Sequence, residues 1–148
     1  MRKKKRHWVW NLVILLTLVL CSLAFTAHYK NWVRLKDDHF SILSGIYYKE
    51  LYYARLDSVF LVEKIPRLER ISGFSAWALE KGVFKDSLNP GKKVYVFVDD
   101  LSHPKIKLVQ RDSLVVFLNF ADTTETRQMY EFLQARKSPG NTGLLPDN

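Results

Sequence analysis

The pattern of hydrophobic and polar residues divides the chain into two parts with different periodicities. From Trp8 to Ala27, about 20 residues pass without a charged side chain. At about 1.5 Å per residue, such a helix spans roughly 30 Å, the thickness of the hydrocarbon core of a bilayer. From Phe40 onward, apolar and polar residues alternate in short segments, which is typical of β-strands. We therefore expect a transmembrane helix followed by a β-rich domain.

The expected transmembrane helix follows a cluster of basic residues. The apolar side chains that mark the span include Trp8, Leu12, Leu16, Leu20 and Ala27, and the basic cluster consists of Arg2, Lys3, Lys4, Lys5 and Arg6. Because basic residues favour the cytoplasmic side, we expect a cytoplasmic N-terminus and an extracytoplasmic domain in a bacterial inner membrane. Trp8 and Trp10 at one end, with Tyr29 and Trp32 at the other, suit the two interfacial aromatic belts.

Two other readings of this segment are a cleaved signal peptide and a lipoprotein signal. The run is long for a signal peptide, and cleavage after Ala27 would place bulky Phe25 where a small residue is expected. A lipoprotein would use Cys21, but Leu20 before it is large. A retained single-pass anchor is therefore favoured.

Four segments beyond the anchor alternate with period two and predict strands: 59–64, 93–98, 105–110 and 113–120. In 105–110 we expect Ile106 and Leu108 to face inward and the two lysines, Lys105 and Lys107, to face outward. A first hairpin is predicted around Ser44 and Gly45. Gly73 and Gly82 suggest bends or a close approach of two backbones.

The period changes to that of a helix after Ala121. Asp122 is the expected N-cap, with Glu125 three residues later as in a capping box. Thr126, Met129 and Leu133 recur at helical spacing. Short strands followed by one amphipathic helix predict a mainly β (α+β) domain, in which the helix covers one end of a small barrel or bent sheet.

The segment from about Tyr48 to Leu133 resembles the bacterial pleckstrin-homology-like (PH-like) domains. The resemblance is carried by the strand that runs into Lys64-Ile65-Pro66, by RISGFSAWALEKGVFK (70–85), by KVYVFVDD (93–100) and by VVFLNFADTTETRQMYEFL (115–133). It implies a partly open β-barrel of about seven strands capped by a C-terminal α-helix. The phosphoinositide-binding loop of eukaryotic relatives has no counterpart here, because that region offers only Lys49 followed by Glu50.

Charge and cysteine content narrow the function classes. The formal charge is +8, and the five basic residues of the N-terminal cluster account for most of it. Without a separate basic stripe, nucleic-acid binding is not expected. Cys21 is the single cysteine, so no intrachain disulfide can form.

Candidate chemistry is sparse, and no cofactor is expected. Asp99, Asp100 and His103 form one compact group that could supply metal ligands, although such loops are more often solvated turns. Four tyrosines in two adjacent pairs form a candidate partner surface: Tyr47, Tyr48, Tyr52 and Tyr53. Neighbours in a strand point to opposite faces, so at most half of them can be core.

We expect a basic N-terminal segment (1–7), a transmembrane helix (8–27), a membrane-proximal linker (28–39), a PH-like domain (40–137) and a flexible tail (138–148). The expected function is a non-enzymatic module that binds an unidentified protein or ligand at the membrane surface, by strand addition at an open sheet edge. The alternatives are a structural subunit of a membrane assembly, and a metal-dependent enzyme using Asp99, Asp100 and His103.

Overall fold

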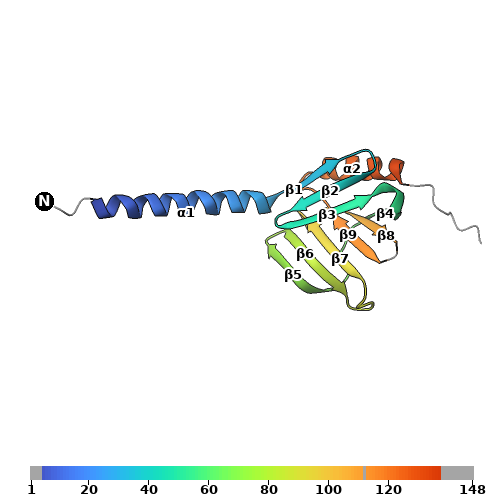
Figure 1. Ribbon diagram of the computed structural model, residues 1–148. Coiled ribbons are helices and arrows are strands. Elements are labelled where there is room, and N and C mark those ends of the chain that lie inside the picture. The colour runs from blue at the N-terminus through green and yellow to red at the C-terminus, as the bar shows by residue number, and fades with distance from the viewer. Residues whose placement is uncertain (1–4, 112, 138–148) are drawn as a thin grey trace, which may run out of the picture.

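The computed structural model describes residues 5–111 and 113–137. A long N-terminal helix extends away from a domain of nine strands and one C-terminal helix (Figure 1). The elements are α1 (Lys5–Tyr29), β1 (Asn31–Leu35), β2 (His39–Ser44), β3 (Tyr47–Tyr52), a short 3₁₀ helix η1 (Tyr53–Arg55), β4 (Leu56–Val62), β5 (Leu68–Ala76), β6 (Leu79–Asp86), β7 (Lys93–Val98), β8 (Lys105–Gln110), β9 (Leu114–Leu118) and α2 (Thr123–Arg136). The prediction of a mainly β domain between two helices is confirmed. The tail 138–148 and residues 1–4 of the basic cluster lie outside the described residues.

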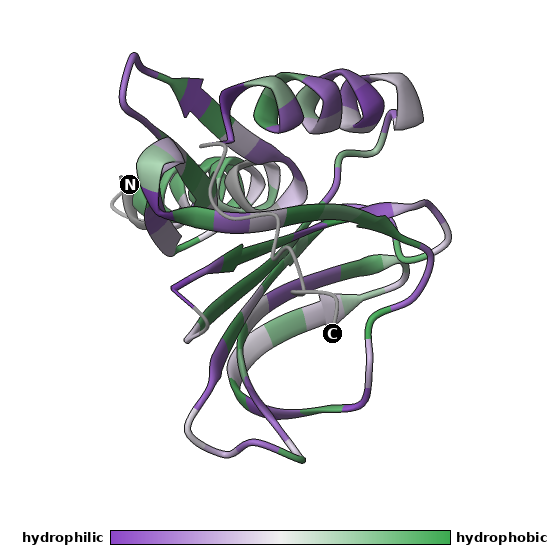
Figure 2. Ribbon diagram, turned by 90° about the vertical axis from the view of Figure 1, so that its right-hand side faces the viewer, coloured by the Kyte–Doolittle hydropathy of each residue, from purple (hydrophilic) through white to green (hydrophobic). Residues whose placement is uncertain are grey.

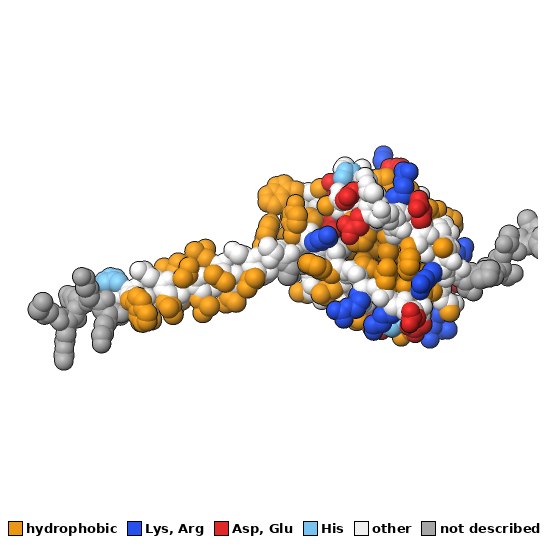
Figure 3. Space-filling view, turned by 90° about the horizontal axis from the view of Figure 1, so that it is seen from above, with side chains coloured by type: hydrophobic (Ala, Val, Ile, Leu, Met, Phe, Trp, Pro, Cys, Tyr) orange, Lys and Arg blue, Asp and Glu red, His pale blue; other side chains and the backbone are white. Residues whose placement is uncertain are grey.

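Helix α1 contains the whole predicted span and extends it at both ends. Its segment His7–Thr26 is long and apolar enough to cross a membrane, and none of it is buried against the domain. Hydrophobic side chains line the helix, whereas the described Lys, Arg, Asp and Glu side chains gather on the domain (Figure 3). A helix that is apolar all round needs an apolar environment, and the domain does not provide one.

The first sheet is an antiparallel meander in the order β1-β2-β3. The predicted hairpin is confirmed: Ser44 pairs with Tyr47 across a two-residue turn in which Gly45 has a φ of 63°. Residues 28–39, the expected linker, instead contain β1, so the folded domain begins at Asn31. The alternation in β1 escaped detection because its most deeply buried position holds the polar Asn31.

The second sheet has six strands in the order β4-β8-β9-β7-β6-β5. All neighbours are antiparallel except β7 and β9, which run parallel. The predicted strands at 93–98 and 105–110 are found with those bounds, and β8 turns into β9 through Arg111. The described residues form nine strands in two separate sheets, rather than about seven in a barrel, and no closed barrel is present among them.

The main core lies between the two sheets and α2. It contains Phe40, Ile42 and Leu51 from the first sheet, Phe97, Ile106, Leu108, Val116 and Leu118 from the second, and Met129 and Leu133 from α2. Asp122 caps α2 by accepting a hydrogen bond from the Thr124 backbone N–H, as predicted. Figure 2 shows apolar strands in the interior and mostly hydrophilic connecting turns.

A second, smaller core fills the opposite face of β6 and β7. It consists of Phe84, Val94, Val96, Val98 and Phe117. Ile65, in the connection between β4 and β5, and Leu68, at the start of β5, pack against it. Gly73 and Gly82 lie opposite each other in the β5–β6 hairpin. A Cβ added at Gly82 would lie 2.6 Å from the Gly73 Cα, so the predicted close approach of two backbones is confirmed.

Candidate functional site at the helix-proximal end

Several connections gather where α1 joins the domain, and we call this region the helix-proximal end. It comprises residues 30–31, the β2–β3 turn (44–47), the β5–β6 turn (76–79), the β7–β8 loop (99–104) and the join between β9 and α2 (119–122). Pairing of Asn31 with Ser44 places the β2–β3 turn beside the start of β1. A hydrogen bond of 2.9 Å from the Leu101 N–H to the Ala78 carbonyl joins the β7–β8 loop to the β5–β6 turn.

Asn31, two residues beyond the end of α1, is the centre of a buried hydrogen-bond network. Its Nδ2 donates to the carbonyl oxygens of Phe97 at 2.7 Å and Asn119 at 2.8 Å. Its backbone N–H donates to Asp99 Oδ2 at 3.1 Å, and its Oδ1 accepts from Ser44 Oγ at 2.5 Å. The side chain of Asn31 therefore connects the start of β1 to β2 of the first sheet and to β7 of the second.

Asp99 also forms an ion pair with Lys81 on β6. Lys81 Nζ lies 2.8 Å from Asp99 Oδ1, and both side chains are almost completely buried. Burial lowers the pKa of Lys81, and the hydrogen bond and charge of Asp99 partly oppose this shift. The burial of Lys81 was not predicted from the sequence. Alternate residues of a strand face the same side, so Asp99 follows Phe97, a residue of the main core, and Tyr95, which packs against that core. This spacing could have indicated that the Asp99 carboxylate points inward.

Asn119 organises the β7–β8 loop from the other side of the network. Its Oδ1 accepts from the backbone N–H groups of Asp99 at 2.9 Å and Asp100 at 3.2 Å. Its Nδ2 donates to the carbonyl oxygens of Asp100 at 2.6 Å and Pro104 at 3.2 Å. These bonds satisfy backbone groups of the β7–β8 loop, which has no ladder partners to satisfy them.

The expectation that Lys105 faces outward is wrong. Its side chain is 1% exposed, and its Nζ donates to the carbonyl oxygens of Glu63 at 2.7 Å and Leu101 at 2.5 Å. Burial lowers the pKa of Lys105. The alternating pattern failed here because Lys105 is the first residue of β8, where loop carbonyls can solvate an inward ammonium.

Asp99, Asp100 and His103 do not converge on one point. Asp99 points to Lys81, whereas Asp100 Oδ1 accepts hydrogen bonds from the Ser102 N–H at 2.8 Å and the Ser102 hydroxyl at 2.6 Å. These bonds lower the pKa of Asp100. His103 Nδ1 lies 3.8 Å from Asp100 Oδ2. Within residues 5–111 and 113–137, no group of three or more acidic, His or Cys side chains could hold a metal ion.

The four tyrosines do not form one surface. Tyr53 is buried beside Phe40 and Phe132, so it cannot meet a partner. Tyr47 donates to or accepts from Ser72 Oγ at 2.7 Å, which joins β3 to β5. Tyr48 is exposed and Tyr52 half-buried, both on the outer side of β3. The prediction that neighbours point to opposite faces is confirmed for Tyr47 and Tyr48.

Two turns of the helix-proximal end carry large apolar side chains into solvent. Ile46, in the β2–β3 turn, is 75% exposed, and Trp77, in the β5–β6 turn, is 88% exposed. Trp77 has a φ of 50°, and it is the first residue of a two-residue hairpin turn, a position that glycine prefers when φ is positive. A left-handed conformation costs a non-glycine residue about 1–2 kcal/mol. The packing of the domain does not explain an indole at this position.

A cavity of about 390 Å³ opens between the β4–β5 crossing and the second core. Ile65, Phe84, Val96 and Leu101 contribute apolar lining, and Lys64, Glu80 and Lys105 contribute polar lining. Glu80 is already bound by Arg70 at 2.9 Å, and Lys105 by two carbonyls. The size is at the lower end of the range for small-molecule pockets.

Strand β5 forms an open edge of the six-stranded sheet. Its residues are exposed from Glu69 to Ser75. The first part carries charge and a register shift between Arg70 and Ser72, both of which oppose pairing with another strand. The second part, Ser72–Ala76, has no charge.

No protein-family model, curated protein or solved structure matches this chain.

Proposed function

We propose that this chain is a single-pass membrane protein whose domain binds an extended protein segment by strand addition at β5. The observation that carries the proposal is the uncharged part of the β5 edge, Ser72–Ala76, which is exposed from Ser72 to Ser75 in a six-stranded sheet. Such an edge offers unpaired backbone groups to a further strand. The role proposed is binding rather than catalysis, in a bacterial inner membrane with the domain on the extracytoplasmic side.

The charged residues near this edge are occupied within the domain. Arg70 binds Glu80 at 2.9 Å and also contacts Ser75, and Lys85 lies 3.0 Å from Glu69. An incoming strand would therefore meet few free charges. Phe74 is 43% exposed and supplies an apolar contact beside the backbone. Specificity would come from side-chain pockets on either side of the added strand.

The anchor supports the same role. Only Lys30 separates α1 from β1, and Asn31 is fixed in the buried network. The domain would be held in a thin layer next to the membrane, which raises its effective concentration toward membrane-bound partners.

A relationship to the PH-like domains remains part of this proposal. The C-terminal helix α2, which packs against β4 and β8 of the six-stranded sheet, supports it. Nine strands in two sheets and the parallel pairing of β7 with β9 are departures from the expected arrangement.

The test uses the full chain in lipid nanodiscs and a displayed library of random peptides. We expect enriched peptides to slow hydrogen exchange of the β5 amides in residues 72–76, because strand addition gives these groups partners. Phe74→Lys should abolish binding. Phe60→Lys is the matched control, because Phe60 is 54% exposed on β4, the other edge of the same sheet.

Enrichment without protection of β5, or binding that survives Phe74→Lys in a folded protein, would refute strand addition. Protection confined to the outer face of β3 would favour the alternative of a structural subunit, in which Tyr48 and Tyr52 contact a neighbouring component.

A further inference from the structure

The position of the exposed apolar turns relative to α1 has a consequence for the membrane. The apolar segment of α1 ends at Thr26, and the helix continues only to Tyr29. Three residues of helix cover about 5 Å. The headgroup layer on each side of the hydrocarbon core is about 5–8 Å thick. The domain of an anchored chain therefore begins inside or at the edge of the headgroup layer.

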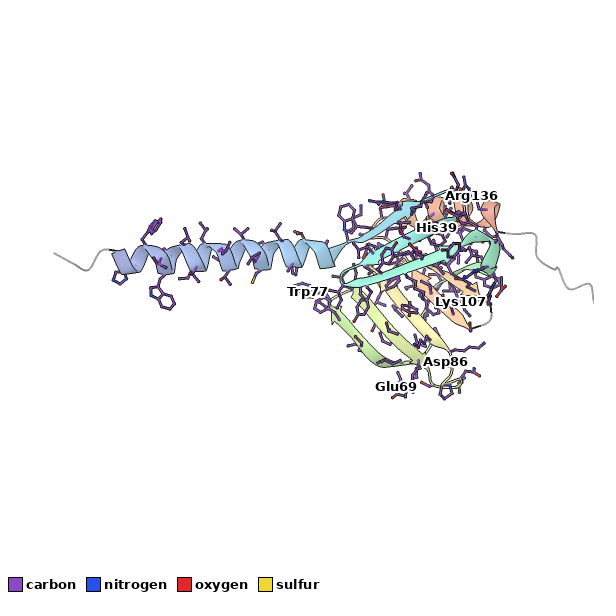
Figure 4. The ribbon with its side chains drawn as sticks, in the orientation of Figure 1. His39, Glu69, Trp77, Asp86, Lys107 and Arg136 are labelled. Carbon is purple, nitrogen blue, oxygen red and sulfur yellow. The ribbon has the colours of Figure 1, made fainter. Side chains whose placement is uncertain are left out.

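The β2–β3 and β5–β6 turns reach back to the level at which α1 ends (Figure 1). Trp77 lies on the margin of the domain nearest α1 (Figure 4). Trp32 and Tyr29, next to the junction, are also more than half exposed. An indole or a phenol is most stable at the boundary between lipid and water, where its ring and its polar atom are both satisfied.

We infer that Ile46 and Trp77 insert into the headgroup region of the bilayer that α1 spans and so hold the domain in one orientation. The inference rests on the proposed membrane anchor. It commits to a lipid surface because the single residue between α1 and β1 leaves the domain no room to move away from that surface.

The contact is apolar rather than electrostatic. Charge near the helix-proximal end is mixed: Lys30 lies 3.8 Å from Glu125, and Asp122 lines the same small pocket as these two residues. An anionic membrane would gain little from such a surface. We therefore expect docking to depend weakly on anionic lipid and on salt.

The orientation has a consequence for β5. Trp77 directly follows Ala76, the last residue of β5. Insertion of Trp77 would place the uncharged part of the β5 edge next to the membrane surface, with the charged residues Glu69 and Arg70 farther away. A partner strand would then be captured close to the bilayer.

The experiment measures tryptophan emission from the full chain in vesicles of phosphatidylethanolamine and phosphatidylglycerol with brominated acyl chains. Three single-tryptophan proteins are compared. The first keeps Trp10, inside α1. The second keeps Trp77. The third keeps none of the native tryptophans and carries Leu88→Trp. Leu88 is the matched control because it is also 88% exposed, but in the β6–β7 connection at the other end of β6.

We expect strong quenching for Trp10, clear quenching with a blue shift for Trp77, and no quenching for the Leu88→Trp protein. Quenching of Trp77 should persist in vesicles of brominated phosphatidylcholine alone, which contain no anionic lipid. Quenching of Trp10 without quenching of Trp77 would overturn docking and leave the anchor intact. Absence of quenching at Trp10 would overturn the anchor, and docking with it. Equal quenching at positions 77 and 88 would show nonspecific adsorption and would also overturn the inference.

Discussion

The side-chain amide of Asn31 and the backbone carbonyl of Asn119 are joined by a hydrogen bond of 2.8 Å, although 88 residues separate them in the chain. This bond links β1, the first strand after α1, to the join that precedes α2. The same amide donates to the Phe97 carbonyl, so one buried polar side chain ties the start of β1 to β7 and to this join.

Replacement of this amide should weaken the whole domain. We expect Asn31→Ala to lower the free energy of unfolding by about 2–4 kcal/mol, because it leaves several buried polar groups without partners. Urea unfolding of the full chain in detergent micelles, followed by circular dichroism, measures the change. Arg34→Ala, at an exposed position of the same strand, is the control and should cost less than about 0.5 kcal/mol. A loss no larger than that of the control would contradict the role given to Asn31.

The buried pair of Lys81 and Asp99 should show strong coupling. Lys81→Met alone or Asp99→Leu alone leaves one charge buried without its partner, which costs about 3–5 kcal/mol. The double variant removes both charges, so we expect it to be more stable than the sum of the single changes implies. Additive losses would show that the two charges do not interact. Because Asp99 also accepts from the Asn31 N–H, the double variant should remain less stable than the natural chain.

Glycine at position 82 is required by the backbone of β5. Gly82→Ala would place a methyl group against the Gly73 Cα and the Ser72 carbonyl, so the β5–β6 hairpin would have to separate. We expect a loss of about 1–3 kcal/mol. Gly91→Ala is the matched control, since nothing lies within 4 Å of a Cβ added there. The unfolding midpoints of the two variants separate the effect of steric crowding at position 82 from the general effect of replacing glycine by alanine. Similar midpoints would contradict the argument.

Relief of the left-handed conformation at Trp77 should stabilise the domain. We expect Trp77→Gly to raise the free energy of unfolding in detergent by about 1 kcal/mol, because glycine adopts a positive φ without a steric penalty. Arg111→Gly, at a φ of 49° in the β8–β9 turn, should give a gain of the same sign. A loss of stability for Trp77→Gly would show that the indole makes contacts important to the fold.

Lowering the pH should remove the contribution of Asp100 to the stability of the folded domain. The Ser102 hydroxyl and N–H lower the pKa of this carboxyl below its ordinary value of 3.8. Its stabilising contribution is therefore present above pH 3.8 and lost as the pH falls through the folded-state pKa. We expect the natural chain to be more stable than Asp100→Asn at neutral pH and the difference to shrink below pH 3.8. Urea titrations at several pH values measure this difference, and a constant gap would refute it.

Local patterns were sufficient to predict several of the regular elements, including both helices. Uninterrupted apolar composition predicts α1, alternation predicts β7 and β8, and the Asp122 cap with Thr126, Met129 and Leu133 predicts α2. These features depend on neighbouring residues only. β1 was missed because a five-residue strand with a buried Asn has no clear alternation. The β5–β6 hairpin was not resolved into two strands because its turn residues, Trp77 and Ala78, are not typical turn formers.

The candidate surfaces required three-dimensional contacts. The sequence could not show that the Tyr53 side chain is buried and the Trp77 side chain exposed, because this difference depends on strands that are distant in the chain. It also could not show that β5 is an edge, because strand order follows from the parallel pairing of β7 with β9.

The sequence by itself determined an apolar helix of membrane-spanning length, a β-rich domain after it and a capped C-terminal helix, because composition, periodicity and capping act over a few residues. Only the tertiary structure decided that Lys81 and Lys105 are buried, that Asn31 connects the start of β1 to both sheets, and that the turns carrying Ile46 and Trp77 lie level with the end of α1. These three features depend on residues that are far away in the chain. Distant groups form hydrogen bonds or ion pairs with the buried polar side chains, and the arrangement of the strands decides which turns remain exposed.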